Sequence, residues 1–470
     1  MNLTFYGAVR TVTGSMFTIE NDGVRVLCEC GLYQGHRAES EQKNRNLPFN
    51  PLEIDQMLLS HAHIDHSGNI PTLVKKGFTG SIYTTFASRD LCSIMLHDSA
   101  HLQEKDVEHV NWMNEHKPRN GKRIPIPKLE PLYTVEDAIR SLRSFRGVVY
   151  ERPIDIADGI KATYHDAGHI LGSAMVEIEL AKRNKKRKIL FTGDLGRKDL
   201  PILKDPFQAD AADILIIEST YGNRIHEPIE TAEEKLTKVI NVTIQRGGKI
   251  IVPAFAVERT QEFIYDLHQL TEQGKIPTIP IYVDSPLAVN ATDIFRLHPE
   301  CLDSETLDYL EKQEDPFGFG KLKYIRDVEE SKRLNSISTP CIIISSSGMC
   351  EGGRILHHLK NNISDARNTI LVIGFMADGT LGKRIVDRMP VVKIFGEPYE
   401  LKAQVVKLNS FSAHADHNEL LEYIKNIKQK PKQVYIVHGN SDQSEPLAEG
   451  IKQLGIPKVS IPEAGSKIPI

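Results

Sequence analysis

The sequence predicts an α/β protein in which one domain is interrupted by an inserted second domain of mostly parallel sheet. The chain has 470 residues, more than one ordinary domain needs. Between residues 214 and 388, short apolar strands alternate with helices, which is typical of a parallel sheet covered on both faces. After Val391, strands again lead into loops that carry histidine, as in the first segment. We therefore expect boundaries at 1–208, 209–392 and 393–470, with the outer parts forming one domain.

The first part begins with alternating apolar and polar residues, and Asn21-Asp22-Gly23 has the composition of a hairpin turn. Short apolar runs predict strands at 2–6, 16–20, 24–28, 57–59, 147–150, 160–165, 174–180 and 189–192. Helices are expected at 70–76, 89–114 and 135–144.

The middle and last parts follow the same reasoning. Strands are expected at 214–217, 249–253, 281–283, 341–344, 370–373, 404–408 and 434–437. Helices are expected at 232–245, 257–272, 287–297, 353–360 and 381–388.

Composition limits the classes of function. With 58 Lys and Arg against 62 Asp and Glu, the net charge of −4 gives no overall attraction to nucleic acid, so any nucleic-acid site must be a local patch. The basic run at 182–188 is interpreted as a hairpin turn that blunts a sheet edge, in preference to a phosphate contact. Because no apolar run approaches the ~20 residues of a membrane span and the six cysteines are scattered, we expect a cytoplasmic protein without disulfides. Cys28 and Cys30 are interpreted as small hydrophobic residues.

One loop carries a dense set of metal-ligand side chains. His61-Ala62-His63-Ile64-Asp65-His66 places three imidazoles and a carboxylate between a predicted strand and a predicted helix. Imidazole and carboxylate are the usual ligands of catalytic zinc, so this spacing strongly favours a metal site. His169, Asp194 and His438 each follow an apolar strand and lie beside a glycine, which is the setting of a ligand-bearing loop.

Together, H-x-H-x-D-H, Gly168-His169, Gly193-Asp194 and His438-Gly439 resemble the motif set of the metallo-β-lactamase superfamily. Further matches resemble its β-CASP branch of nucleic-acid nucleases, and the likeness spans nearly the whole chain. These matches are Glu218 in 217–222, Val252–Ala256, Arg259-Thr260-Gln261, Ser345–Met349, Gly379–Gly382 and His414 in 412–416. The resemblance implies a metallo-β-lactamase αββα sandwich with an inserted α/β (β-CASP) domain, and it is closest to RNA-cleaving members.

Carried over by position, the resemblance implies two zinc ions per chain, although manganese tolerates the same ligands. One ion would be held by His61, His63 and His169. The other would be held by Asp65, which also belongs to the implied catalytic set, with His66 and His438, and Asp194 would bridge the two.

The resemblance departs at one position. Glu29 precedes Cys30-Gly31 where the family usually has Asp. The extra methylene keeps the carboxylate and changes its reach, so the role of Glu29 stays open.

A two-metal site suits hydrolysis of a phosphodiester, because two ions activate a water and offset charge on phosphorus. The resemblance implies His414 as general acid, with Glu218 holding its imidazole and raising its pKa. His417 is interpreted as structural. Candidate RNA or phosphate contacts lie near a strand end before a helix, where backbone N–H groups bind phosphate. They are Arg259, Ser345, Ser346, Ser347, Gly348 and Arg354.

We therefore expect a metal-dependent ribonuclease that leaves 5′-phosphate and 3′-hydroxyl ends. A lactamase or thioesterase would leave the large insertion and the Glu218–His414 pair without a role. A β-CASP DNA nuclease would tend to lack His438, and a non-enzymatic scaffold would have eroded ligands. Endonuclease and 5′-exonuclease action, the preferred RNA and the oligomeric state, with a homodimer as one option, are left open.

Overall fold

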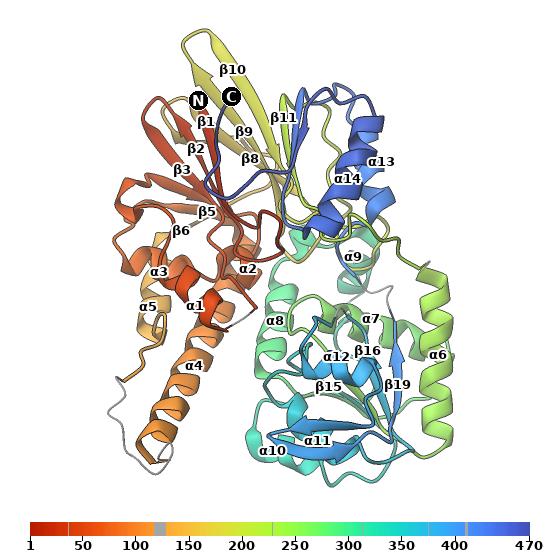
Figure 1. The fold of residues 1–470 in the computed structure, drawn as a ribbon. Helices are drawn as coiled ribbons and strands as arrows, with labels where there is room; N and C mark the ends of the chain where they lie inside the picture. The colour runs from red at the N-terminus through yellow and green to blue at the C-terminus, as the bar shows by residue number, and fades with distance from the viewer. Residues whose placement is uncertain (36, 117–127, 228, 313, 375, 409–411) are drawn as a thin grey trace. The chain divides into compact units, whose positions relative to one another are not determined.

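The computed structural model describes residues 1–470 except 36, 117–127, 228, 313, 375 and 409–411. The chain forms two compact units (Figure 1). The first unit comprises residues 1–198, 205–225 and 414–470, and the second comprises 199–204 and 226–413. No helix in the described part of the chain is both long and apolar enough to cross a bilayer.

The first unit contains two seven-stranded sheets. One has the order β22 (Lys467–Pro469), β1 (Asn2–Gly7), β2 (Met16–Asn21), β3 (Val24–Cys28), β4 (Gln56–Leu58), β5 (Ile82–Thr85), β6 (Phe145–Val148). The other has the order β21 (Val459–Ser460), β20 (Gln433–Ile436), β11 (Ile214–Ile217), β10 (Lys185–Phe191), β9 (Ala174–Lys182), β8 (Ile160–Asp166), β7 (Ile154–Ala157).

The two sheets pack face to face through a shared apolar core. Phe17 of the first sheet meets Phe191 of the second, with ring centroids 5.0 Å apart, in a cluster that draws alternate residues from both sheets. Helices cover the outer faces, which gives an αββα sandwich. They are α1 (Arg37–Arg45), α2 (Ile64–Ser67), α3 (Ile70–Lys75), α4 (Phe86–His116), α5 (Val135–Ser141), α13 (His417–Asn426) and α14 (Ser441–Gln453), with 3₁₀ turns at Pro51–Glu53 and Leu142–Ser144.

The second unit is built on a six-stranded parallel sheet. Its order is β14 (Leu322–Tyr324), β13 (Ile281–Val283), β15 (Ile342–Ser345), β12 (Ile250–Pro253), β16 (Thr369–Val372), β19 (Gln404–Lys407). Its helices are α6 (Ile229–Gln245), α7 (Arg259–Glu272), α8 (Pro286–Leu297), α9 (Ser304–Glu311), α10 (Val328–Leu334), α11 (Ile355–Asn362) and α12 (Leu381–Val386), with a 3₁₀ turn at Pro299–Cys301. β17 (Val391–Ile394) and β18 (Glu397–Glu400) form a separate hairpin.

The unit junctions differ from the boundaries expected at 208/209 and 392/393. β11 pairs with β10 and with β20, so residues up to Ile225 belong to the first unit. β19 pairs with β16 and belongs to the second. Strand pairing, which short apolar runs do not reveal, places both segments.

The basic run at 182–188 lies at a hairpin turn, as expected, but the turn itself is shorter than the run. β9 and β10 continue to Lys182 and from Lys185, so the turn comprises only Arg183 and Asn184, with Arg183 at φ 53°. Lys182 pairs with Asp22 at 2.9 Å and Lys188 with Glu177 at 2.8 Å. Most of the basic residues of this run therefore lie in the paired strands β9 and β10 and not in the turn.

Candidate metal centre

The histidine loop follows β4 directly and ends in the short helix α2. The backbone of His66 donates to the carbonyl of His63 at 2.9 Å, and the amide of Cys30 donates to His66 at 2.8 Å. One turn of helix thus brings Asp65 and His66 back beside the strand end. His61 and His66 are fully buried.

The remaining candidate ligands come from the ends of three other strands. His169 lies in the loop between β8 and β9, where Ser173 Oγ accepts the His169 amide at 3.0 Å. Asp194 comes after β10 and Gly193. Gly193 has φ 56°, and a Cβ added to it would lie 2.8 Å from the Cβ of Ser60. His438 follows β20 with φ 51°, and its amide donates to Ala8 at 2.7 Å. Close backbone packing holds each loop.

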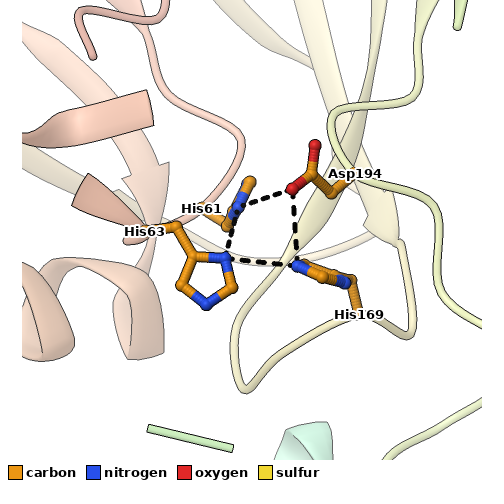
Figure 2. Close-up of side chains that lie close together, drawn as sticks. All are labelled: His61, His63, His169 and Asp194. Carbon is orange, nitrogen blue, oxygen red and sulfur yellow. Dashed lines mark hydrogen bonds and ion pairs between the residues drawn. The ribbon is translucent and has the colours of Figure 1, made fainter. Parts of the chain in front are cut away.

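The first ligand cluster consists of His61, His63, His169 and Asp194 (Figure 2). His63 Nδ1 lies 3.2 Å from His61 Nε2 and 3.2 Å from His169 Nε2. Asp194 Oδ2 lies 3.5 Å from each of those two Nε2 atoms.

The second cluster consists of Asp65, His66 and His438. The Nε2 atoms of His66 and His438 are 3.1 Å apart, and Asp65 Oδ2 lies 3.4 Å from His438 Nε2. Asp194 Oδ1 is 3.3 Å from His66 Nε2, so the two oxygens of Asp194 face different clusters. The structure therefore brings together all seven residues that the motifs single out.

The donor set fits divalent cations. A neutral imidazole has one N–H donor and one acceptor nitrogen. When several buried ring nitrogens face one another, protons cannot satisfy all of them, because some contacts are left with two lone pairs or two N–H groups facing each other. Among the described residues, none makes a hydrogen bond of good geometry to the buried Asp194 Oδ1, although His66 Nε2 lies 3.3 Å and His438 Nδ1 3.6 Å from it. Seven ligand-type residues in two groups also exceed what one tetrahedral zinc ion uses.

The protonation states also suit metal binding, with one exception. Burial, reinforced by neighbouring imidazoles, lowers the pKa of His61 to about 4 and that of His63 to about 3. Burial would raise the pKa of Asp194, but the surrounding histidines hold it well below its usual value. For His66, burial lowers the pKa but the Asp194 and Glu29 carboxylates outweigh it and raise it. A metal that binds His66 must therefore displace a proton.

Glu29 links the two clusters through hydrogen bonds to Ser60 and His66. It is fully buried at φ 62°. Its Oε1 accepts the Ser60 amide at 2.7 Å, and its Oε2 accepts the Ser60 hydroxyl at 2.9 Å and His66 Nδ1 at 2.6 Å. Ser60 Oγ also lies 2.9 Å from His61 Nδ1.

This network sets the tautomers of two ligands. The Ser60 hydroxyl has one proton, which it donates to the Glu29 carboxylate, so it must accept the proton on His61 Nδ1. His66 likewise donates from Nδ1 to Glu29. Nε2 of both rings is then left to face its cluster, as in the carboxylate–histidine pairs that support metal ligands.

Ser60→Ala is therefore expected to weaken metal binding at the first cluster about 10–100-fold and to leave the second nearly unchanged. Glu29→Gln is expected to weaken both, because it removes the shared acceptor. Metal content measured against increasing chelator distinguishes the two patterns. Ser67→Ala is the matched control, since the buried Ser67 hydroxyl donates to the backbone carbonyls of Ala62 and His63 and not to a ligand side chain. Equal losses from Ser60→Ala and Ser67→Ala would contradict the tautomer assignment.

His414 lies beside the first cluster and is held by Glu218. Its Nδ1 is 3.0 Å from Glu218 Oε1, and its ring centroid is 4.4 Å from that of His169. Glu218 is fully buried and also accepts the amides of Leu195 and Thr220. Burial alone would lower the pKa of His414, but the Glu218 carboxylate outweighs it and raises the pKa to about 9. The side chain is 20% exposed, so it combines a positive charge with access to solvent.

Other candidates have structural surroundings. His417 begins α13, and its Nδ1 lies 2.6 Å from the Gly222 carbonyl. Cys28 and Cys30 are buried, which raises the pKa of each thiol, and neither belongs to a ligand group found in the described part of the chain.

The candidate phosphate contacts, Gly348 among them, all belong to the second unit, and the side chains of the two arginines and three serines have internal partners. Arg259 is paired with Glu262, and Arg354 donates to Asp284 at 2.7 Å. Ser345 Oγ donates to the Asp284 carbonyl at 2.8 Å. Ser346 Oγ is 2.8 Å from Ser285 Oγ, and Ser347 Oγ accepts the Glu351 amide at 3.2 Å.

Asp284, which no sequence motif singled out, organises this region through its side-chain contacts. Its buried carboxylate accepts from Ser331 Oγ at 2.6 Å and lies 2.6 Å from His358 Nε2, in addition to its pair with Arg354. Its position directly after the apolar strand β13 was the available signal.

Three family models match successive parts of the chain. Residues 18–199 match a metallo-beta-lactamase superfamily domain, and residues 260–385 match a Beta-Casp domain. Residues 398–462 match a Zn-dependent metallo-hydrolase RNA specificity domain.

Several proteins are similar over most of their length. Ribonuclease TTHA0252 of Thermus thermophilus is 33% identical and covers all of both chains. An RNase J-like protein of Methanocaldococcus jannaschii is 32% identical over 100% of this chain and 99% of that protein. Transcription termination factor FttA of Methanosarcina mazei is 31% identical over 96% of this chain and 69% of that protein. A crystal structure of an Enterococcus faecalis protein of unknown function shares the fold, with TM-score 0.55, 14% identity and 99% coverage of both chains.

Proposed function

Because this chain belongs to the β-CASP branch of the metallo-β-lactamase superfamily, we propose that it is a metal-dependent ribonuclease. The observation that carries the proposal is the pair of ligand clusters that share Asp194, with the Glu218–His414 pair beside them. The full-length relatives named ribonuclease and RNase J-like support RNA as the substrate. The six free cysteines suit a reducing compartment and support action in the cytoplasm.

We propose a site for two zinc ions, in which His61, His63 and His169 would hold one ion and Asp65, His66 and His438 the other, with one oxygen of Asp194 facing each cluster. When bound, two such ions activate a water and offset negative charge at phosphorus. Glu29 and Ser60 keep the ligand nitrogens directed inward. His414, protonated because of Glu218, supplies the proton that the departing sugar oxygen requires.

The arginines and serines of the second unit are proposed to act on RNA through the loop after β15. Their side chains are engaged within the protein, so we propose that they position the loop and that the backbone N–H groups of Ser346 and Gly348 meet phosphate, whereas that of Ser347 donates to the Gly352 carbonyl at 3.2 Å.

RNA cleavage is expected to leave 5′-phosphate and 3′-hydroxyl ends, because water and not the 2′-hydroxyl attacks phosphorus. RNA labelled at either end reports both the termini and whether cleavage is internal or begins at the 5′ end. A substrate with 2′-O-methyl at the scissile nucleotide should still be cut. Products with 2′,3′-cyclic phosphate would contradict the mechanism. Equal cleavage of matched DNA would favour a DNA nuclease, and β-lactam or thioester turnover without action on RNA would favour a small-molecule hydrolase.

A further inference from the structure

The two central strands of the second unit, β12 and β15, lead to opposite faces of its sheet. They are adjacent and parallel over Ile250–Pro253 and Ile342–Ser345. The helix after β12, α7, packs in one apolar core, whereas the helix after β15, α11, packs in the other. The loops that leave these strands therefore diverge. Such a point in an open parallel sheet is where α/β proteins bind ligands.

A large aromatic side chain stands at this point. Phe255 lies in the loop after β12 and is 41% exposed, although Ala254 and Ala256 on either side of it are buried. Its backbone is held in place, since Thr260 Oγ1 donates to the Phe255 carbonyl at 2.6 Å. A single exposed phenylalanine is common on protein surfaces, so exposure alone indicates little.

The glycines around the ring distinguish Phe255 from an ordinary exposed phenylalanine. A Cβ added to Gly348, in the loop after β15, would lie 2.9 Å from Phe255 Cδ2 and 3.0 Å from its Cε2. One added to Gly374, after β16, would lie 3.8 Å from Cε2. Neither glycine has the positive φ that would itself require glycine. The absent side chain at Gly348 thus serves to seat one edge of the ring against backbone while the rest stays accessible.

We propose that Phe255 is a stacking platform for one nucleobase of the RNA. This rests on the ribonuclease function proposed above and adds a contact to it. A flat, uncharged, exposed ring beside a loop of serine and glycine suits a nucleotide, with the base on the ring and its phosphate near backbone N–H groups. Stacking accepts any base, so the platform contributes affinity and register without sequence preference.

Phe255→Ala and Phe255→Leu in the full chain should each raise the Kd for single-stranded RNA about 5- to 150-fold, the range that loss of one base–aromatic stack produces. Phe255→Tyr and Phe255→Trp should bind as wild type. The leucine variant separates stacking from apolar packing. RNA binding is measured by fluorescence anisotropy in excess chelator, because the chelator removes metal from every variant alike and so prevents cleavage. Phe395→Ala is the matched control, because Phe395 of the same unit is 54% exposed and lies at the β17–β18 turn.

A second measurement locates the stacked base. Wild-type protein should bind RNA with one abasic nucleotide more weakly at a single register, and Phe255→Ala should lose that dependence. If wild-type protein cleaves RNA but Phe255→Ala and Phe255→Leu bind RNA as wild type does, the platform is refuted and the ribonuclease function stands. If Phe255→Leu binds as tightly as wild type while Phe255→Ala does not, Phe255 is an apolar contact, and the platform is again refuted. If wild-type protein neither binds nor cleaves RNA, both proposals fall.

Discussion

His414→Ala is expected to lower the rate of RNA cleavage about 10²–10⁴-fold while the protein keeps its full metal content. The reason is geometric. His414 is paired with the buried carboxylate of Glu218 at 3.0 Å and belongs to none of the groups of possible metal ligands found in the described residues. Its removal should take away a proton donor and leave the ligands in place.

A sulfur-substituted substrate tests this directly. Sulfur leaves phosphorus readily without a proton, so RNA with a 3′-bridging sulfur at the scissile bond should restore much of the rate of His414→Ala relative to wild type. His417→Gln is the matched control, because His417 contacts the Gly222 carbonyl and should retain a rate near wild type. Loss of metal from His414→Ala, or equal sulfur effects on mutant and wild type, would place His414 among ligands or packing residues.

The pH dependence should change in a defined direction with Glu218. The protonated form of His414 dominates below its pKa of about 9 and is lost as pH rises through that value. Glu218→Gln removes the negative charge that raises the pKa, so the alkaline decline in kcat should begin at lower pH. If the alkaline decline in kcat begins at the same pH in Glu218→Gln as in wild type, the decline belongs to the titration of another group.

Asp194→Ala is expected to cause the largest loss of bound metal of any single substitution, with cleavage activity reduced to background. Asp194 is the only one of the seven proposed ligands that faces both clusters: its Oδ2 lies 3.5 Å from His61 Nε2 and its Oδ1 lies 3.3 Å from His66 Nε2. His61→Ala and His438→Ala each change one cluster directly and should lose less. Elemental analysis of protein purified without chelator measures all three.

Asp284→Ala is the control for Asp194→Ala. Asp284 is equally buried and accepts several hydrogen bonds but lies in the second unit, so its loss should lower stability and leave the metal ratio of folded protein unchanged. A wild-type ratio near one metal per chain would contradict the two-ion proposal. The 3′-bridging sulfur should not rescue Asp194→Ala, since a better leaving group does not replace a metal ligand.

The sequence alone was sufficient for the local part of the site. Three histidines and Asp65 lie within six residues between a strand and a helix, and that spacing leaves little freedom once both elements form. The inserted parallel sheet was likewise predicted from element order, the αββα sandwich was implied by the resemblance to the metallo-β-lactamase superfamily, and the structure confirms both.

Tertiary structure decided what depends on contact between distant segments. Glu29 was left open because its reach depends on how β3 and β4 align, and parallel pairing brings its carboxylate to Ser60 and His66. Spacing along the chain cannot show that the two oxygens of Asp194 face different clusters.

The unit junctions and the role of Asp284 also depend on contacts between distant segments. β11 and β19 are both short apolar strands, and only their partners, β10 and β16, assign them to different sheets. Asp284 has no distinctive sequence neighbours, and its role comes from Ser331, Arg354 and His358, which reach it from elsewhere in the fold. Local spacing determines which groups are available, whereas strand pairing and burial decide which of them meet, because both depend on interactions between residues far apart in the chain.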